Sequence, residues 1–380
     1  MAPTHVSIKK HFARLKDPRL NRRKRHLLID IVVIAICAVI CGADSWPQIA
    51  LFARKRLDWL KTFLSLPNGA PSHDTFARVF ALLNPEAFQA CFRQWMQALA
   101  DRLGVKQIAI DGKTLRRSGA AASGLGPLHL VSAWATQNHL TLGQMAVDGK
   151  SNEITAIPKL LELLDLNGAL VTIDAMGCQK EIARGVVEAG GDYVLTVKDN
   201  QPHLLADIQE CFAAALENDF AGLSHDSYET KDKGHGREEA RYYDVIYEPE
   251  KLRNKEAWAE LSVIGMCLSE RTVGEKTSQE VRYFIGSRKA SARVYGKAMR
   301  NHWGIENGLH WVLDVTFRED DNRVRDRNAA ENLAELRRVA VSLLKQHPSK
   351  QSIACKRLEA ALDTDFLEEI LRGACNVGNL

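Results

Sequence analysis

The sequence predicts an α/β protein in which a mixed sheet has helices on both faces and is preceded by an all-helical module. Two observations support this fold class. Residues 27–103 have helical periodicity, with breaks only at 42–47, 67–71 and Asn84-Pro85. From Gln107 onward, three strand-like segments are followed by alternating helices and strands, an order typical of a mixed sheet covered on both faces.

The N-terminal segment, residues 1–26, is strongly basic. It holds nine Lys or Arg residues and one Asp, a net charge of +8, so the rest of the 380-residue chain carries −4 of the total of +4. A flexible basic arm of this kind indicates contact with a polyanion, either nucleic acid or an anionic membrane surface. The same composition is equally typical of a solvated, disordered terminus.

The most apolar run is LLIDIVVIAICAVICGA, residues 27–43. A membrane anchor is one interpretation, but the run is slightly shorter than a span and contains Asp30. We therefore expect a buried core helix. The eight cysteines include no CxxC pair, which favours free thiols in a reducing compartment, the cytoplasm, over a disulfide framework or zinc ribbon.

The elements follow from local patterns. Ser72 is a predicted N-cap for a helix whose Phe76, Val79, Phe80 and Leu83 share one face, within a small four-helix unit. Strands are expected at 107–116, 128–137, 140–149, 169–176 and 192–198, the first three as an antiparallel meander, with helices at 154–166, 179–190 and 203–216. Residues 220–287 are predicted to be mainly β, and helices at 332–346 and 365–374 close the chain.

Two aspartates occupy similar settings, Asp111 in IAIDGK and Asp174 in VTIDAM, each directly after an apolar stretch. A carboxylate at a buried strand end is costly unless it is paired, hydrogen-bonded or bound to a metal. Because the ends of adjacent strands form the usual ligand crevice of an α/β sheet, we expect both side chains to converge there.

The stretch HWGIENGLHW, residues 302–311, supplies a third carboxylate, Glu306. If this stretch is an α-helix, which turns by 100° per residue, its side chains form two neighbouring faces. The apolar face is formed by Ile305, Leu309, Val312 and Leu313. The polar stripe is formed by His302, Glu306, His310 and Asp314. A helix packed through its apolar face would direct Glu306 toward the two aspartates.

Three carboxylates favour Mg²⁺ or Mn²⁺, and two such ions suit a metal-dependent nuclease or strand-transfer enzyme. Two other interpretations of Glu306 were weighed. It could be a surface partner of the histidines four residues away on either side. A zinc site on this one helix is disfavoured, because residues at i, i+4 and i+8 span about 12 Å of helix axis.

Several segments together resemble the H-repeat-associated family of bacterial insertion-sequence transposases. They are HLLIDIVVIAICAVICGADSW, GAPSHDTFARVF, AIDGKTLRRS, TIDAMGCQKEIA, YVLTVKDNQ, GHGREEAR and RNHWGIENGLHWVLDVTFREDDNRVR. The last run is highly specific, and the resemblance covers nearly the whole chain. It implies a DDE catalytic domain with an RNase H-like fold at 104–350, containing a β-rich insertion at about 220–287. The basic arm 1–26 and a helical transposase-associated domain 27–103 would precede it, and C-terminal helices 351–380 would follow.

The resemblance also implies roles for residues. Asp111, Asp174 and Glu306 become the catalytic, metal-binding triad for Mg²⁺ or Mn²⁺, with two ions. Broader relatives carry a tyrosine, arginine, glutamate and lysine signature, where this chain has Met299, His302 and Leu313 in place of the tyrosine, arginine and lysine. The tyrosine and lysine roles are therefore not transferred, whereas His302 could replace the arginine as a phosphate contact.

DNA contacts are predicted near the triad and in the insertion. They are Lys113 and Arg116, with Arg117 beside them; Lys198 and Asn200 in KDNQ; His235, Arg237 and Arg241 in a candidate hairpin; and His302 and His310. Solvated loop residues, and pairing of Arg237 and Arg241 with neighbouring glutamates, are the alternatives. Trp303 and Trp311 could stack on an extruded base, but packing is the favoured interpretation.

The sequence therefore predicts a DNA transposase that cuts element ends and joins the 3′-OH to target DNA. Double-stranded DNA at element ends and target is the expected partner, self-association is expected, and the protein would act in the cytoplasm on nucleoid DNA. A domesticated or inactive relative that binds DNA without cutting it is the second hypothesis. A membrane-anchored protein is the third.

Overall fold

The computed structural model describes residues 5–119, 124, 126–147, 152–234 and 236–375. The chain forms two compact units. Unit 1 comprises residues 1–105, 112–150 and 306–380, and unit 2 comprises residues 106–111 and 151–305. The chain therefore passes from unit 2 to unit 1 inside strand β1 (Gln107–Leu115) and again between Ile305 and Glu306.

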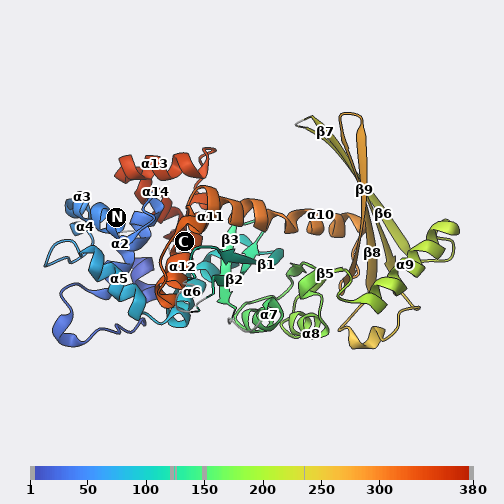
Figure 1. Cartoon of the computed structure of the whole chain (residues 1–380), viewed down its shortest axis with the longest axis horizontal. Helices are drawn as coiled ribbons and strands as arrows, with labels where there is room; N and C mark the ends of the chain where they lie inside the picture. The colour runs from blue at the N-terminus through green and yellow to red at the C-terminus, as the bar shows by residue number, and fades with distance from the viewer. Residues whose placement is uncertain (1–4, 120–123, 125, 148–151, 235, 376–380) are drawn as a thin grey trace. The chain divides into compact units, whose positions relative to one another are not determined.

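Unit 1 begins with a series of helices (Figure 1). They are α1 (His5–Phe12), η1 (Asn21–Arg23), α2 (Leu28–Ile40), α3 (Trp46–Lys55), α4 (Leu57–Lys61), α5 (His73–Leu82) and α6 (Pro85–Leu103). Ser72 caps α5 by accepting from Thr75 N at 3.3 Å, as predicted, and Asn84 caps α6 by accepting from Ala87 N at 2.8 Å. These caps satisfy backbone donors that a helix start leaves unpaired.

Helix α2 is buried on every side, which confirms the core helix expected from the apolar run. Even Asp30 is only 1% exposed, and its Oδ2 accepts a hydrogen bond from Leu66 N at 3.3 Å. No helix among the described residues has the length and apolar character needed to cross a membrane.

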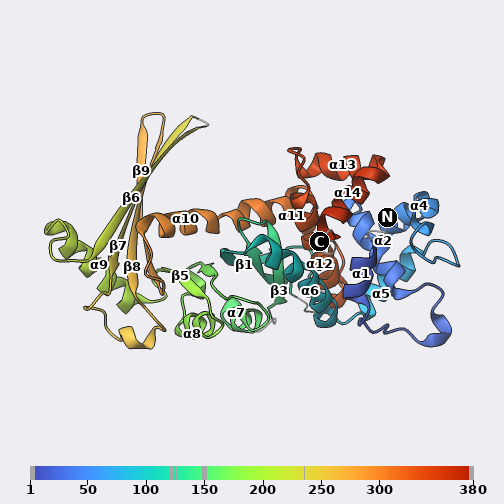
Figure 2. The ribbon, with the colours of Figure 1, turned by 180° about the vertical axis from the view of Figure 1, so that it is seen from behind.

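The basic N-terminal segment differs from the flexible arm expected. Residues His5–Phe12 form α1, in which Ile8 and Phe12 are buried. Helix α1 packs against α6, and both helices are labelled in Figure 2. The Phe12 ring lies 4.8 Å from the Phe92 ring and 5.9 Å from the Phe88 ring in α6. The sequence did not reveal this helix, because its two buried residues, four apart, are a short signal in a segment dominated by charges.

The second half of β1 in unit 1 is joined by β2 (Leu128–Ala135), and β2 pairs antiparallel with β3 (Leu140–Ala146). After Glu306 the unit continues with η5 (Glu306–His310), α11 (Trp311–Val315), η6 (Glu319–Asp321), α12 (Arg327–Gln346), α13 (Ile353–Leu362) and α14 (Thr364–Cys375). Helix α12 is the centre of this unit, because it packs against α2, α5, α6, β3 and α14.

Unit 2 contains a mixed sheet in which the first half of β1 pairs parallel with β4 (Leu170–Ile173) and β4 pairs parallel with β5 (Asp192–Val197). Helices α7 (Glu153–Leu161) and α8 (Lys180–Glu188) alternate with these strands, and α9 (Pro202–Glu217) follows them. The alternation of helix and strand confirms the predicted α/β class.

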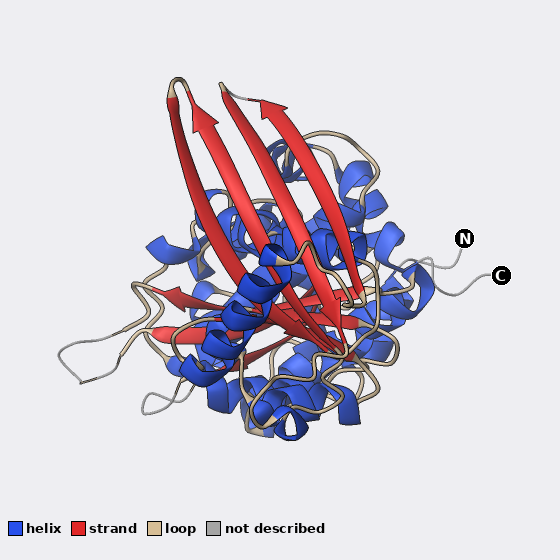
Figure 3. Cartoon of the chain, turned by 90° about the vertical axis from the view of Figure 1, so that its right-hand side faces the viewer, coloured by secondary structure: helices blue, strands red, loops and turns tan. Residues whose placement is uncertain are grey.

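The insertion is β-rich, as predicted. It forms an antiparallel meander of β6 (His225–Gly234), β7 (Arg237–Tyr247), β8 (Val263–Val273) and β9 (Lys276–Gly286), whose long strands are evident in Figure 3. Strand β9 pairs antiparallel with β5, which joins the meander to the parallel strands of unit 2. Helix α10 (Ala292–His302) packs on this sheet through Ala292, Tyr295 and Ala298.

Candidate active site

Asp111 and Asp174 leave matched positions on neighbouring parallel strands of unit 2. The last register pair of β1 and β4 is Ile110 with Ile173, and each aspartate is the next residue along its strand. Adjacent strands lie about 4.8 Å apart, so the two carboxylates start from the same edge of the sheet. The apolar strands that precede them are buried, which fixes this register.

The turn after Asp174 is held by specific contacts. Asp174 Oδ1 accepts from Met176 N at 3.1 Å and from Gly177 N at 3.4 Å. From the KDNQ segment, Asn200 Nδ2 donates to Ala175 O at 2.7 Å and Gln201 Nε2 donates to Cys178 O at 2.8 Å. Asn200 therefore positions the Asp174 turn, a role that the sequence prediction of a DNA contact did not include.

The electrostatic surroundings of Asp174 favour a bound cation. Burial raises the pKa of Asp174, and the charge of Glu153 raises it further, against backbone hydrogen bonds and the charge of Lys198, which lower it. A divalent cation would relieve this crowding of negative charge. Carboxylate oxygens are also the donors that Mg²⁺ and Mn²⁺ prefer, so the residues present fit such an ion.

Glu153 is an acidic neighbour of Asp174 that the sequence analysis missed. It is the first residue of α7, and α7 packs against the turn that follows Asp174. The only sequence signal was an acid at a helix start, which is commonplace because acids stabilise helix N-termini.

The third predicted acid, Glu306, is exposed and is the first residue of unit 1 after Ile305. It begins η5, a π-helical turn rather than part of a regular α-helix. The predicted apolar face is confirmed, since Ile305, Leu309 and Leu313 are fully buried. The π turn, however, changes the angular phase of Glu306 relative to Asp314, which a uniform step of 100° could not anticipate. Within the described ranges, no three His, Cys, Asp or Glu side chains cluster closely enough to hold one ion.

The phosphate contact of His302 stays a prediction, but its ring also has a partner within unit 2. Its Nδ1 lies 3.0 Å from Thr172 Oγ1 in β4, and burial lowers the pKa of His302 to about 4. The ring is therefore neutral at physiological pH and links α10 to the strand that leads to Asp174. His310, in the π turn, is half-buried, and its DNA contact stays a prediction.

Lys113 and Arg116 are also predicted to contact DNA, and this stays a prediction, but Lys113 has acidic partners inside unit 1. Lys113 is only 8% exposed, and its Nζ lies 2.7 Å from Asp314 Oδ1 and 3.2 Å from Asp320 Oδ1. Arg116 Nε lies 3.2 Å from Asp320 Oδ2, although its side chain is largely exposed. The ammonium of Lys113 thus forms ion pairs inside unit 1. Its acidic partners lie some 200 residues further along the chain, so no local sequence pattern predicts the pairing.

Three arginines of the insertion, together with Arg300 of α10, gather around Glu239, and we call this group the arginine face. Arg237 and Arg241 both pair with Glu239, at 3.1 Å and 2.5 Å, and Arg271 and Arg300 lie 3.9 Å from the same carboxylate. Pairing with glutamate was the alternative weighed for Arg237 and Arg241, yet four arginines exceed the charge of Glu239 and Asp232. The predicted DNA contact His235 lies outside the described residues.

Both tryptophans of the quoted stretch are exposed, Trp303 by 41% and Trp311 by 58%. This differs from the packing role favoured for them. The Arg282 guanidinium lies over the Trp303 ring at 4.7 Å, a cation–π contact.

Two family models match the chain. One, "DDE_Tnp_1-associated", matches residues 9–96, and the other, "Transposase DDE domain", matches residues 105–343. The chain belongs to the DDE transposase family. Among its relatives, "H repeat-associated putative transposase YhhI" of Escherichia coli K12 is 39% identical over 373 residues, 97% of this chain and 98% of that protein.

Two further comparisons qualify the relationship. "Inactive transposase YbfQ" of Escherichia coli K12 is 42% identical over 72 residues, 19% of this transposase and 86% of that protein. The piggyBac transposase in its synaptic complex with hairpin DNA has a TM-score of 0.40 at 9% sequence identity. The alignment covers 96% of this chain and 77% of that chain.

Family membership places the geometry in context. Transposase DDE domains generally use divalent metal ions and act on DNA, and the mixed α/β architecture of this transposase is consistent with the RNase H-like fold of that family. Asp111 and Asp174, at matched strand positions, are the residues to test first as catalytic acids.

Proposed function

We propose that this chain is an active insertion-sequence transposase that cuts the ends of its own element and joins each 3′-OH to target DNA. The observation that carries the proposal is the pairing of Asp111 and Asp174 at the same edge of unit 2, with crowded negative charge around Asp174. A cation-binding function would suit this edge, because burial and the charge of Glu153 both disfavour the ionised carboxylate of Asp174 unless positive charge is bound there.

In this proposal Asp111, Asp174 and Glu306 hold Mg²⁺ or Mn²⁺, as two ions. The bound metal would supply an activated water and stabilise negative charge on the leaving oxygen. Asp111 and Asp174 bind from the sheet edge, while Asn200 keeps the turn of Asp174 in place. Hydrolysis breaks the P–O3′ bond and releases a 3′-OH, whose oxygen then attacks a target phosphodiester and displaces the target's 3′ oxygen.

The arginine face supports DNA binding. Arg237, Arg241, Arg271 and Arg300 carry more positive charge than their acidic neighbours, and they would contact the phosphate backbone. Lys198, exposed at the end of β5 and near Asp174, would contact phosphate beside the cut. Two copies acting on paired ends, in the cytoplasm and on nucleoid DNA, complete the proposal.

A cleavage assay on DNA that carries the element's terminal sequences tests the function. Wild-type protein should cut this DNA with Mg²⁺ and stop cutting with a chelator. Asp111→Asn, Asp174→Asn and Glu306→Gln should each abolish cutting while still shifting the DNA in a gel. Glu188→Gln, an exposed carboxylate at the end of α8, is the matched control and should cut normally. Retained cutting by all three site variants would contradict the assignment.

The second candidate function is DNA binding without cutting. It is favoured by one observation, the relative named as inactive. The same assay separates the two, because a wild-type chain that shifts the terminal DNA but leaves it intact under every divalent cation would support the second function.

A further inference from the structure

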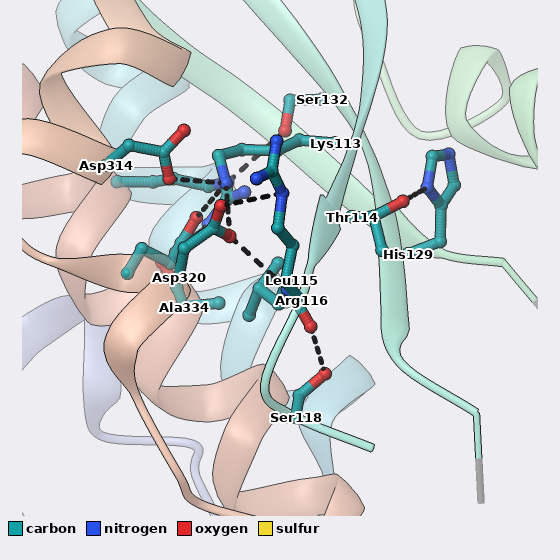
Figure 4. A network of polar contacts seen from close by, with 12 residues as sticks. Lys113, Thr114, Leu115, Arg116, Ser118, His129, Ser132, Asp314, Asp320 and Ala334 are labelled. Atoms are coloured by element: carbon teal, nitrogen blue, oxygen red, sulfur yellow. Dashed lines mark hydrogen bonds and ion pairs between the residues drawn. The ribbon is translucent and has the colours of Figure 1, made fainter.

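A network of ion pairs joins β1 to the segment that follows Glu306 (Figure 4). At its centre, Lys113 Nζ lies 2.7 Å from Asp314 Oδ1, 3.2 Å from Asp320 Oδ1 and 3.7 Å from Glu319 Oε2. Lys113 is 8% exposed. A buried ammonium with three carboxylates around it is held in one place far more firmly than an exposed surface pair.

The network is anchored in the core of unit 1. Glu319 Oε1 accepts from Arg338 Nη1 at 2.9 Å, and both side chains are fully buried. Arg338 Nε also donates to Ser132 Oγ at 3.2 Å, which connects α12 to strand β2. Glu319, one of the three carboxylates around Lys113, is therefore itself connected to strand β2 through Arg338.

The two ends of the Lys113–Asp314 pair lie close in sequence to predicted metal ligands. Lys113 is two residues after Asp111, so their side chains share one face of β1. Asp314 is eight residues after Glu306, in the helical segment that η5 begins and α11 continues. A π turn is less regular than an α-helix, so a contact beyond it is needed to fix where the turn starts.

We propose that Lys113 and Asp314 are a positioning pair that sets the register of the Glu306 segment against β1. This inference rests on the proposed function, because only that function makes Glu306 a metal ligand. Loss of the pair leaves the π turn free to rotate or slide, which lowers metal affinity without removing any ligand. Second-layer contacts of this kind typically change metal affinity by about 10- to 100-fold.

The test compares Asp314→Asn with Asp44→Asn in the full-length chain. Asp44 forms an ion pair of similar exposure in the same unit, with its Oδ1 3.1 Å from Arg357 Nη2. Asp314→Glu, which keeps the charge, is the rescue variant. Three quantities are measured: the thermal midpoint, the dissociation constant for Mn²⁺ from the electron paramagnetic resonance signal of the free ion, and cleavage against metal concentration.

We expect Asp314→Asn to weaken Mn²⁺ binding by about tenfold or more, and to raise the metal concentration for half-maximal cleavage by the same factor. Asp314→Glu should recover part of this loss. Asp44→Asn should lower the thermal midpoint but leave Mn²⁺ binding at the wild-type level. This pattern separates positioning of the metal site from general stability.

Two outcomes would overturn the inference, and Asp111→Asn distinguishes them. If Asp111→Asn loses Mn²⁺ binding but Asp314→Asn retains it at the wild-type level, the positioning role is wrong and the proposed metal site stands. If Asp111→Asn binds Mn²⁺ as tightly as wild type, the proposed metal site is itself wrong, and the positioning role falls with it.

Discussion

Replacing Arg338 with Met should destabilise unit 1 by about 3–5 kcal/mol, the usual effect of removing one partner from a buried ion pair. The magnitude follows from the surroundings. Arg338 and Glu319 are both fully buried and 2.9 Å apart, and the next cation, on Lys113, lies 3.7 Å from the other Glu319 oxygen. Burial also raises the pKa of Glu335 to about 7 despite the opposing charge of Arg338, so the variant removes a cation from a second buried acid.

Urea denaturation followed by tryptophan fluorescence measures this loss as a lower midpoint with an unchanged slope. Adding Glu319→Leu to Arg338→Met removes the stranded charge and should recover most of the stability, since apolar replacement of a whole buried pair is often neutral. Arg372→Met, which removes an exposed pair with Glu368, is the control and should change stability by less than about 1 kcal/mol. A loss below about 1 kcal/mol for Arg338→Met, or a double variant no better than the single, would refute the reasoning.

Three other predictions test separate parts of the chain. Gly177→Ala would place a Cβ 2.2 Å from Cγ2 of Ile173, so it should destabilise the protein by about 1–3 kcal/mol and slow cleavage. Gly185→Ala in α8 would make only ordinary contacts and should be neutral or slightly stabilising. Urea unfolding and the cleavage assay check both variants. Because the pKa of His302 falls from 6.5 unfolded to about 4 folded, the contribution of His302 to stability should be constant above pH 6.5 and decline by about 3 kcal/mol toward pH 4. The stability of wild type minus that of His302→Gln, from unfolding measured across pH, should fall by this amount, and a difference that does not change with pH would contradict the prediction. Arg237→Ala should weaken DNA binding for all sequences and reduce the salt slope by about 1, while Arg253→Ala, paired with Asp207 away from the arginine face, should leave that slope unchanged.

Local patterns predicted much of the fold. The cap at Ser72 and the buried face of the Glu306 segment depend on residues three or four positions apart, so one sequence contains the whole signal. The strands before Asp111 and Asp174 were recognisable because parallel strands buried on both faces are continuous apolar runs. The register that matches the two aspartates follows from that same burial.

Tertiary partners were the part that sequence could not supply. The acidic partners of Lys113 are about 200 residues away in sequence, so no local pattern indicated them. The burial of His302 against Thr172 is likewise set by the packing of α10 on β4. The π turn at Glu306 could not be recognised, because the helical periodicity was read with a constant angle of 100° per residue. Glu153 gains its relation to Asp174 only through the contact of α7 with the turn after β4.

The burial of α2 has a consequence for how the protein is made. Its apolar surface leaves the ribosome early, yet α12, which covers it, begins only at Arg327. At about 5–20 residues per second, the interval is on the order of 15–60 seconds of translation. During that time the part of the α2 surface that α12 covers stays uncovered in the nascent polypeptide, although α1 and α3 can already pack on α2. A premature stop codon ahead of α12 would therefore release a fragment with exposed apolar surface that favours aggregation.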